Sequence, residues 1–262
     1  MKIFFMGDIV GNPGRMAIRE LLPELIARKK IDFVIANCEN GAAGFGVTQK
    51  VADELFRYHI DVLTSGNHIW NKKEIVDFIG SYEKLLRPAN YPSSTPGAGS
   101  VLVPLKTGEC IGVLNLAGRI FMQPIDCPFV TAKNKVAELR EKTNVIIVDM
   151  HAEATSEKRA LGWYLDGEVS AVLGTHTHVQ TADEEILPQG TAYISDVGMT
   201  GPFDSVIGIK KEIVIERFLT QMPNKFDLAK DDIRMQGVII TIDAESGKAK
   251  SIERISVKLK YS

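Results

Sequence analysis

Short apolar runs alternate with helical patterns along this chain, and no other feature of the sequence restricts the fold as much. Apolar runs of strand length occur at residues 2–6, 32–37 and 60–64, and a helical pattern follows each of them. A parallel connection between strands needs a crossover of helix length, so this alternation is typical of a parallel sheet covered by helices. The first third of the chain is therefore predicted to be an α/β structure.

The helices of this first part are predicted from capping residues and apolar spacing. Asn12 is expected to cap the first helix, with Pro13 at its first helical position and apolar residues recurring from Ile18 at helical spacing. Thr48 is expected to cap a second helix, on which Val51 shares one face with later apolar residues. A short third helix is expected over residues 72–79.

The rest of the chain continues in the same style and ends in antiparallel strands. Residues 87–99 are rich in turn formers and predict a long loop. The remaining expected elements are a hairpin of 100–105 with 110–116, helices over 131–141, 156–165 and 211–221, and strands over 144–149, 170–174, 191–195, 236–242 and 251–259. We interpret residues 1–262 as a single α/β domain with a mixed sheet system.

Composition narrows the class of protein. Lys and Arg number 31 against 33 Asp and Glu, a net charge of −2, which disfavours a protein that grips long DNA by phosphate neutralisation. The first apolar run is interrupted at Asp8, and the charge-free stretch 88–105 is broken by prolines, so neither predicts a membrane segment. Three cysteines without a CxxC pair fit a reducing compartment. We expect a cytoplasmic protein without a membrane partner.

Polar side chains follow five of the predicted strands. Carboxyl ends of parallel strands meet at one edge of a sheet, where ligands of open α/β sheets bind. The residues at these positions are Asp8, Glu39 and Asn40, Asn67 and His68, His151, and His176 and His178. Each alone has an ordinary explanation as a turn former, a helix cap or a buried histidine. Their joint occurrence in glycine-flanked loops predicts a metal centre, with the two imidazoles of the His-x-His segment pointing the same way.

The donor set indicates which ions would bind. Without the adjacent His68, it holds three imidazoles, two carboxylates and two amide oxygens, and mixed nitrogen and oxygen ligation suits iron, manganese, zinc or cobalt. The number of ligands allows two ions to share one carboxylate. Cys38 adjoins Glu39 but faces the opposite way in an extended segment, so we expect it to be a buried structural residue.

Motifs spread over essentially the whole chain carry a family resemblance. They are the segments at residues 7–15 (GDIVGNPGR), 37–41 (NCENG), 65–70 (SGNHIW), 149–153 (DMHAE), 174–178 (GTHTH) and 195–202 (SDVGMTGP). The chain resembles the calcineurin-like metallophosphoesterases, and within them the bacterial YmdB-like phosphodiesterases, which act on 2',3'-cyclic nucleotides. The resemblance implies a β-sandwich of mixed sheets flanked by helices. It departs from the wider superfamily at Val10, where a histidine is usual, and at Glu39, where an aspartate is usual.

The resemblance also implies roles for the residues at the strand ends. One ion would be held by Asp8, Glu39, Asn40 and His178, and the other by Glu39, Asn67, His151 and His176. A hydroxide between the ions would attack phosphorus, and His68 would be the catalytic proton donor. We expect iron first, with manganese or zinc as alternatives. The expected partner is a small phosphodiester substrate, with RNA ends and a second copy of this chain left open.

Three alternatives to this function remain at this point. The same centre would serve a broad metal-dependent phosphatase or nuclease, or a regulatory protein that binds a nucleotide or a protein partner with weak catalysis. A metal amidohydrolase also uses His-x-His but lacks the Gly-Asn-His element. Residues with open roles are Asp149 and Glu153 as partners of the His151 ring, Asp196, and Arg15, Lys72, Lys73 and Arg119 as phosphate contacts.

Overall fold

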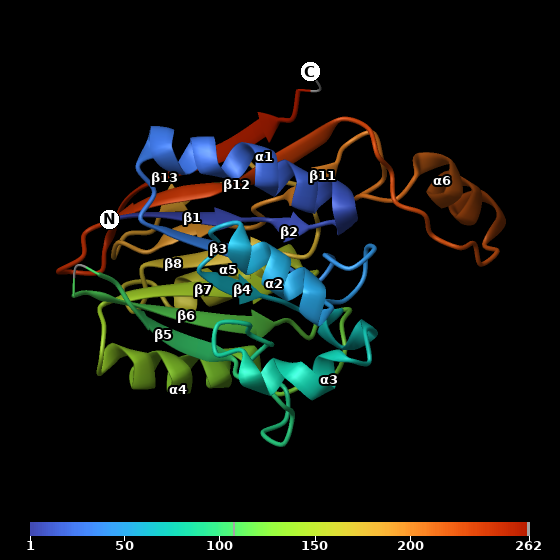
Figure 1. Cartoon of the computed structure of the whole chain (residues 1–262). Helices are drawn as coiled ribbons and strands as arrows, with labels where there is room; N and C mark the ends of the chain where they lie inside the picture. Colours follow the sequence, from blue (N-terminus) through green and yellow to red (C-terminus); the bar gives the residue numbers. More distant parts are fainter. Residues whose placement is uncertain (107, 261–262) are drawn as a thin grey trace.

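Two mixed β-sheets pack face to face, with helices on both outer faces, in the computed structural model of the chain (Figure 1). The structure describes residues 1–106 and 108–260. Within them the first sheet holds seven strands: β1 (Lys2–Met6), β2 (Asp8–Ile9), β3 (Phe33–Asn37), β4 (Val62–Thr64), β11 (Met199–Pro202), β12 (Ile233–Ile242) and β13 (Ala249–Lys258). The second sheet holds six among the same residues: β5 (Ser100–Pro104), β6 (Cys110–Ala117), β7 (Val145–His151), β8 (Ala171–Thr175), β9 (Glu185–Ile186) and β10 (Ala192–Ile194).

The helices connect the parallel strands and cover the sheets. In the described residues the helices are α1 (Gly11–Lys29), α2 (Gln49–Arg57), α3 (Ile75–Phe78), α4 (Pro128–Arg140), α5 (Thr155–Tyr164) and α6 (Lys211–Thr220), with short 3₁₀ turns η1 (Ile69–Asn71) and η2 (Ile79–Ser81) on either side of α3. In this part of the chain no helix is both long enough and apolar enough to span a bilayer.

Each sheet combines a group of parallel strands with antiparallel additions. In the first sheet, β1, β3 and β4 are parallel, and β12 pairs antiparallel with β1, β11 and β13. In the second sheet, β6, β7, β8 and β10 are parallel, with β5 and β9 antiparallel at the edges. The predicted sandwich of mixed sheets flanked by helices is confirmed.

The alternation of side chains along the strands builds three apolar layers. On β1, Ile3 and Phe5 face the second sheet, whereas Phe4 and Met6 face α1 and α2. A third layer lies between the second sheet and helices α4 and α5. The parallel strands of each sheet are covered on both faces, by the other sheet and by helices. Their sequences are therefore continuous apolar runs and not alternating ones.

Several local predictions need correction. Asn12 does not cap α1: the helix begins at Gly11 after Val10, and the Asn12 side chain accepts a hydrogen bond from Arg15. A tertiary contact sets this start, since the Gly11 N–H donates to the Asn40 carbonyl at 2.9 Å. The α-helix expected over 72–79 is limited to the four residues of α3, which lies between two 3₁₀ turns. A 3₁₀ turn has three residues per turn, so the spacing of the apolar residues fits it as well as an α-helix.

Some strand boundaries differ from the predicted ones, because strand pairing continues beyond the apolar runs. His151 is the last residue of β7 instead of following the strand, because β7 pairs with both β6 and β8 to that point. The short strands β2, β9 and β11 were not predicted; β2 and β11 are defined by pairing with each other, Asp8 opposite Met199. Thr48 does cap α2, accepting from the Val51 N–H at 3.3 Å.

Candidate metal centre

Five segments from the two sheets bring the predicted residues to one edge of the sandwich. Asp8 follows β1, Glu39 and Asn40 follow β3, and Asn67 and His68 follow β4, all on the first sheet. The second sheet adds His151 at the end of β7 and the segment of His176 and His178 after β8. The structure therefore brings together residues that are up to 170 positions apart in sequence.

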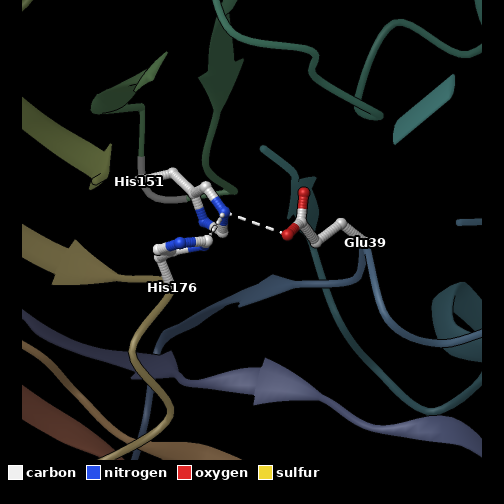
Figure 2. Close-up of side chains that lie close together, drawn as sticks. All are labelled: Glu39, His151 and His176. Carbon is white, nitrogen blue, oxygen red and sulfur yellow. Dashed lines mark hydrogen bonds and ion pairs between the residues drawn. The ribbon is translucent and has the colours of Figure 1, made fainter. Parts of the chain in front are cut away.

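His151 lies at the centre of this cluster. Its Nε2 atom is 2.9 Å from Glu39 Oε1, 3.0 Å from Asn67 Oδ1 and 3.1 Å from His176 Nδ1 (Figure 2 shows the first and last of these partners). One ring nitrogen carries at most one proton and cannot satisfy three acceptors at once. Ligand atoms of Glu39, His151 and His176 all lie within 4.8 Å of one another, which is the arrangement a shared cation would satisfy.

Asp8 and Asn40 supply buried oxygen atoms beside this cluster. Asp8 Oδ2 accepts from the His176 backbone N–H at 3.1 Å, and Oδ1 lies 3.7 Å from His178 Nε2. Within the described residues, neither Asp8 Oδ1 nor Asn40 Oδ1 has a hydrogen-bond partner, although both atoms are buried. A buried acceptor without a partner costs about 1–3 kcal/mol. A cation at this position would supply the missing partner, so the residues present fit a metal ion.

Hydrogen bonds on the far side of each ring turn a nitrogen lone pair toward the centre. His178 Nδ1 lies 3.0 Å from the Ile207 carbonyl, so Nδ1–H donates there and Nε2 is left as an acceptor. His151 Nδ1 lies 2.9 Å from Thr175 Oγ1, which itself donates to Asp149 at 2.7 Å. The threonine oxygen, at a shorter distance than the Asn37 amide nitrogen at 3.3 Å, can accept from Nδ1–H, and a neutral His151 ring then has its Nε2 lone pair toward the centre.

The third ring is oriented in the same way by Glu153. His176 Nε2 lies 3.1 Å from Glu153 Oε2, which leaves Nδ1 as the acceptor facing His151. The sequence left Asp149 and Glu153 open as partners of the His151 ring. In the structure Asp149 acts on that ring through Thr175, and Glu153 contacts His176 instead.

Burial and mutual charge shift the acidities of the cluster. Burial raises the pKa of Asp8 from 3.8 to about 8. Burial opposes ionisation of Glu39 too, but its pKa is lowered to about 2 by His151 and by the N–H of His68. The pKa of His151 is raised to about 9 by Glu39 and Asp8 against its burial, whereas burial and His151 lower the pKa of His176 to about 3. A cation bound at this centre would therefore displace protons from Asp8 and His151.

The His-x-His segment is not the extended strand that the sequence suggested. His176 has φ +99° and His178 has φ +63°, a region that costs non-glycine residues about 1–3 kcal/mol each. The two rings consequently face different partners, His176 toward His151 and His178 toward Asp8. The prediction that both point the same way from a strand is wrong, although both reach the centre.

A buried ion pair holds the residue between these histidines. Asp196 Oδ2 accepts from the Thr177 N–H at 3.0 Å, from Thr177 Oγ1 at 2.8 Å and from Lys158 Nζ at 2.9 Å. Both charged side chains are almost wholly buried. Lys158 was missed in the sequence, yet it shares a helix face with Leu161 and Leu165, and a charge on an apolar face was the available signal.

His68 occupies the border between the cluster and an open cavity of about 600 Å³. Its backbone N–H donates to Glu39 Oε2 at 2.8 Å, and its half-buried ring packs edge-on against Phe45, with centroids 4.9 Å apart. Both rings line the cavity, as do Glu39, His176 and His178. His68 is thus tied to Glu39 through its backbone while its ring remains available to a bound molecule.

The basic residues proposed from sequence do not line this cavity. Arg15 pairs with Glu54 at 3.1 Å and donates to the Gly41 carbonyl at 2.6 Å, so it holds the loop after Glu39 in place. Arg119, Lys72 and Lys73 are also outside the lining. Among the described residues, Arg217 on α6 is the one lysine or arginine that lines it, and nothing in its local sequence marked it.

Comparisons with known proteins identify the family of the chain. The chain matches the family described as YmdB-like protein over residues 4–255. It is 51% identical to the 2',3'-cyclic-nucleotide 2'-phosphodiesterase of Bacillus subtilis (strain 168), with 98% of this chain and 97% of the relative covered. Two crystal structures have a TM-score of 0.92: a hypothetical protein from Thermus thermophilus, 41% identical with 98% and 99% coverage, and a phosphatase from Mycoplasma pneumoniae, 35% identical with 98% and 93% coverage. The chain belongs to the YmdB-like protein family.

Proposed function

We propose that this protein is a phosphodiesterase that hydrolyses 2',3'-cyclic nucleotides with the help of two metal ions. The observation that carries the proposal is the set of imidazole lone pairs that converge with the unpartnered Asp8 oxygen beside an open cavity. The activity of the Bacillus subtilis relative, 51% identical over nearly the whole chain, supports the choice of substrate.

The geometry supports a division of the donors into two groups. Glu39, Asn67 and His176 each have an atom within 3.1 Å of His151 Nε2. These residues, together with His151, would hold one ion. Asp8, Asn40 and His178 would hold the other, with Glu39 shared between the two. The bound ions would supply Lewis acidity and a nucleophile derived from water near neutral pH. The mixed nitrogen and oxygen donors suit iron, manganese or zinc. Of these, iron is the proposed ion, with manganese or zinc as alternatives.

His68 is the proposed proton donor. Hydrolysis of a cyclic phosphodiester releases a ribose alkoxide, which is a strong base and needs a proton as the P–O bond breaks. An imidazole at the cavity border can donate that proton near neutral pH. The hydrogen bond from the His68 N–H holds its backbone beside the Glu39 carboxylate, and the ring nitrogen Nδ1 lies 3.4 Å from Asn71 Oδ1.

The experiment combines elemental analysis of the purified protein with rates on esters of different leaving groups. His68→Ala should keep its metal content and lose far more activity on a cyclic nucleotide than on a nitrophenyl ester, because nitrophenolate leaves without a proton. His59→Asn is the matched control, since His59 lies in a different surface hollow and Asn tolerates its positive φ. Equal losses on both esters would remove the acid role, and a lost metal would make His68 a ligand.

A second candidate function is a broad phosphatase with the same centre. The Mycoplasma pneumoniae phosphatase, 35% identical to this chain, favours it. The proposal for cyclic nucleotides requires that kcat/KM on 2',3'-cyclic nucleotides exceed that on nucleoside monophosphates and on short RNA under matched metal conditions. The reverse order would select the phosphatase or nuclease function, and binding without turnover would select a regulatory one.

A further inference from the structure

The arm that contains α6 forms a second wall of the cavity. In Figure 1 this helix stands apart from the two sheets. The cavity is lined by the metal-centre residues and by side chains from residues 206–228, among them Val214, Phe218, Phe226 and Leu228. No residue of α6 is buried, so this described helix contributes little to the core. Its apolar side chains are instead placed beside a ligand cavity.

Arg217 is a positively charged residue of α6 that lines this cavity. Its guanidinium lies over the Phe226 ring, 4.8 Å from the centroid, which limits where the side chain can point. Among the described residues, no acceptor hydrogen-bonds or pairs with that guanidinium. The acidic residues of the same cavity are engaged elsewhere, Glu39 with His151 and Glu153 with His176. Arg217 is therefore available to an anionic ligand.

Arg217 belongs to α6, which stands apart from the two sheets that carry the metal-centre residues (Figure 1). The single charge of a nucleoside 2',3'-cyclic phosphate lies on the scissile group, which the metal centre would neutralise. A cation on α6, beside the rings of Phe218 and Phe226, suits a second anion at the other end of the nucleoside. In nucleotides, such an anion is a phosphate on the 5'-oxygen. A guanidinium group binds phosphate oxygens through two parallel N–H donors.

We propose that Arg217 binds a phosphoryl group on the 5'-oxygen of the substrate, so that the preferred substrate is a nucleoside 2',3'-cyclic phosphate with a 5'-phosphate or phosphodiester. This inference rests on the proposed function. The second phosphate has two sources with the same chemistry, a free 5'-phosphorylated nucleotide or the end of an RNA chain. Phe218 and Phe226 would supply the apolar surface against which the nucleoside lies.

The test compares kcat/KM on adenosine 2',3'-cyclic phosphate, its 5'-phosphorylated form and a dinucleotide that ends in the cyclic phosphate. The metal-loaded wild-type protein should favour the two substrates with a second phosphate. Arg217→Gln should reduce that preference by roughly tenfold or more, as expected for loss of a hydrogen bond to a charged group, and Arg217→Lys should restore part of it. Lys225→Gln, which removes an exposed charge outside the cavity lining, should keep the preference.

Each outcome separates this inference from the proposed function. Activity of the wild-type protein with no preference for a second phosphate, or an equal loss on all three substrates in Arg217→Gln, would overturn the role of Arg217. Absence of hydrolysis of every cyclic phosphate by the wild-type protein would instead refute the proposed function. A preference for the dinucleotide over the 5'-phosphorylated nucleotide would identify RNA ends as the source, and the reverse preference would identify the free nucleotide. Equal rates on these two, both above the rate on the substrate without a second phosphate, would support recognition of the phosphate alone.

Discussion

Removal of one charge from the buried pair of Lys158 and Asp196 should destabilise the protein strongly. The Lys158→Met substitution keeps most of the side-chain volume but leaves the Asp196 carboxylate, 1% exposed, without its cation. Loss of one partner of a buried pair costs about 3–5 kcal/mol. Asp196 keeps three hydrogen bonds, from the Thr177 N–H, Thr177 Oγ1 and the Gly198 N–H, so we expect the low end of that range.

The assay is urea and thermal unfolding in EDTA. A loss of about 3 kcal/mol corresponds to a fall in Tm of roughly 6–12 °C for a chain of this size. The double variant Lys158→Met/Asp196→Asn should recover part of the loss, because the neutral amide no longer needs a counter-charge. Lys133→Met is the control: Lys133 pairs with Glu168 at 3.2 Å on the surface, and its removal should change stability by about 0.5 kcal/mol or less.

The single variant Lys158→Met should also weaken metal binding, because Asp196 holds Thr177 in place between the proposed ligands His176 and His178. A loss of roughly 10- to 100-fold in metal affinity is typical when a group that orients ligands is removed. A change in unfolding free energy as small as that of the surface control would show that the Lys158 charge is not needed to keep Asp196 buried. Unchanged metal affinity would show that the Lys158 charge is not needed for Asp196 to hold Thr177 in place between His176 and His178.

In EDTA, the free energy of unfolding should fall as the pH rises from 6.5 to 8, because the native protein then holds protons on Asp8 and His151 that the unfolded chain has mostly released. Asp8→Asn should flatten this slope in urea titrations at several pH values, and an identical slope would contradict the assignment. Gly66→Ala should lose metal on dialysis, because an added Cβ would lie 2.0 Å from His151 Cδ2, whereas Gly80→Ala, with open space around it, should retain metal. Cys38 should resist a thiol reagent in the native protein, because it is fully buried and burial raises its pKa; labelling at the rate of the unfolded chain would refute this.

Features that depend on neighbours in sequence were predictable. The cap at Thr48 needs only the N–H of Val51, three residues away, and the amphipathic pattern of α2 follows from side chains within nine residues. The placement of polar residues at strand ends was equally local to each segment. Because parallel strands align their carboxyl ends, that local pattern was enough to predict which residues converge.

Features that depend on distant partners were not predictable. The start of α1 depends on the Asn40 carbonyl, and the strand pair β2 and β11 joins residues about 190 positions apart. The orientation of the His178 ring depends on the carbonyl of Ile207, a group that every residue possesses and that no sequence pattern can mark. Arg217 also resembled any exposed arginine until the fold placed it on the cavity wall.

The geometry of the histidines suggests that the centre is organised before any ion binds. Two of them, His176 and His178, have positive φ angles, and such strain persists only where surrounding contacts fix the backbone. Here those contacts are the Asp196 bonds to Thr177 and the bonds from each ring to Glu153 or the Ile207 carbonyl. None of them uses the nitrogen that faces the centre. The fold therefore stabilises the ligand orientation independently of the cation, and binding an ion requires loss of protons but little rearrangement of the chain.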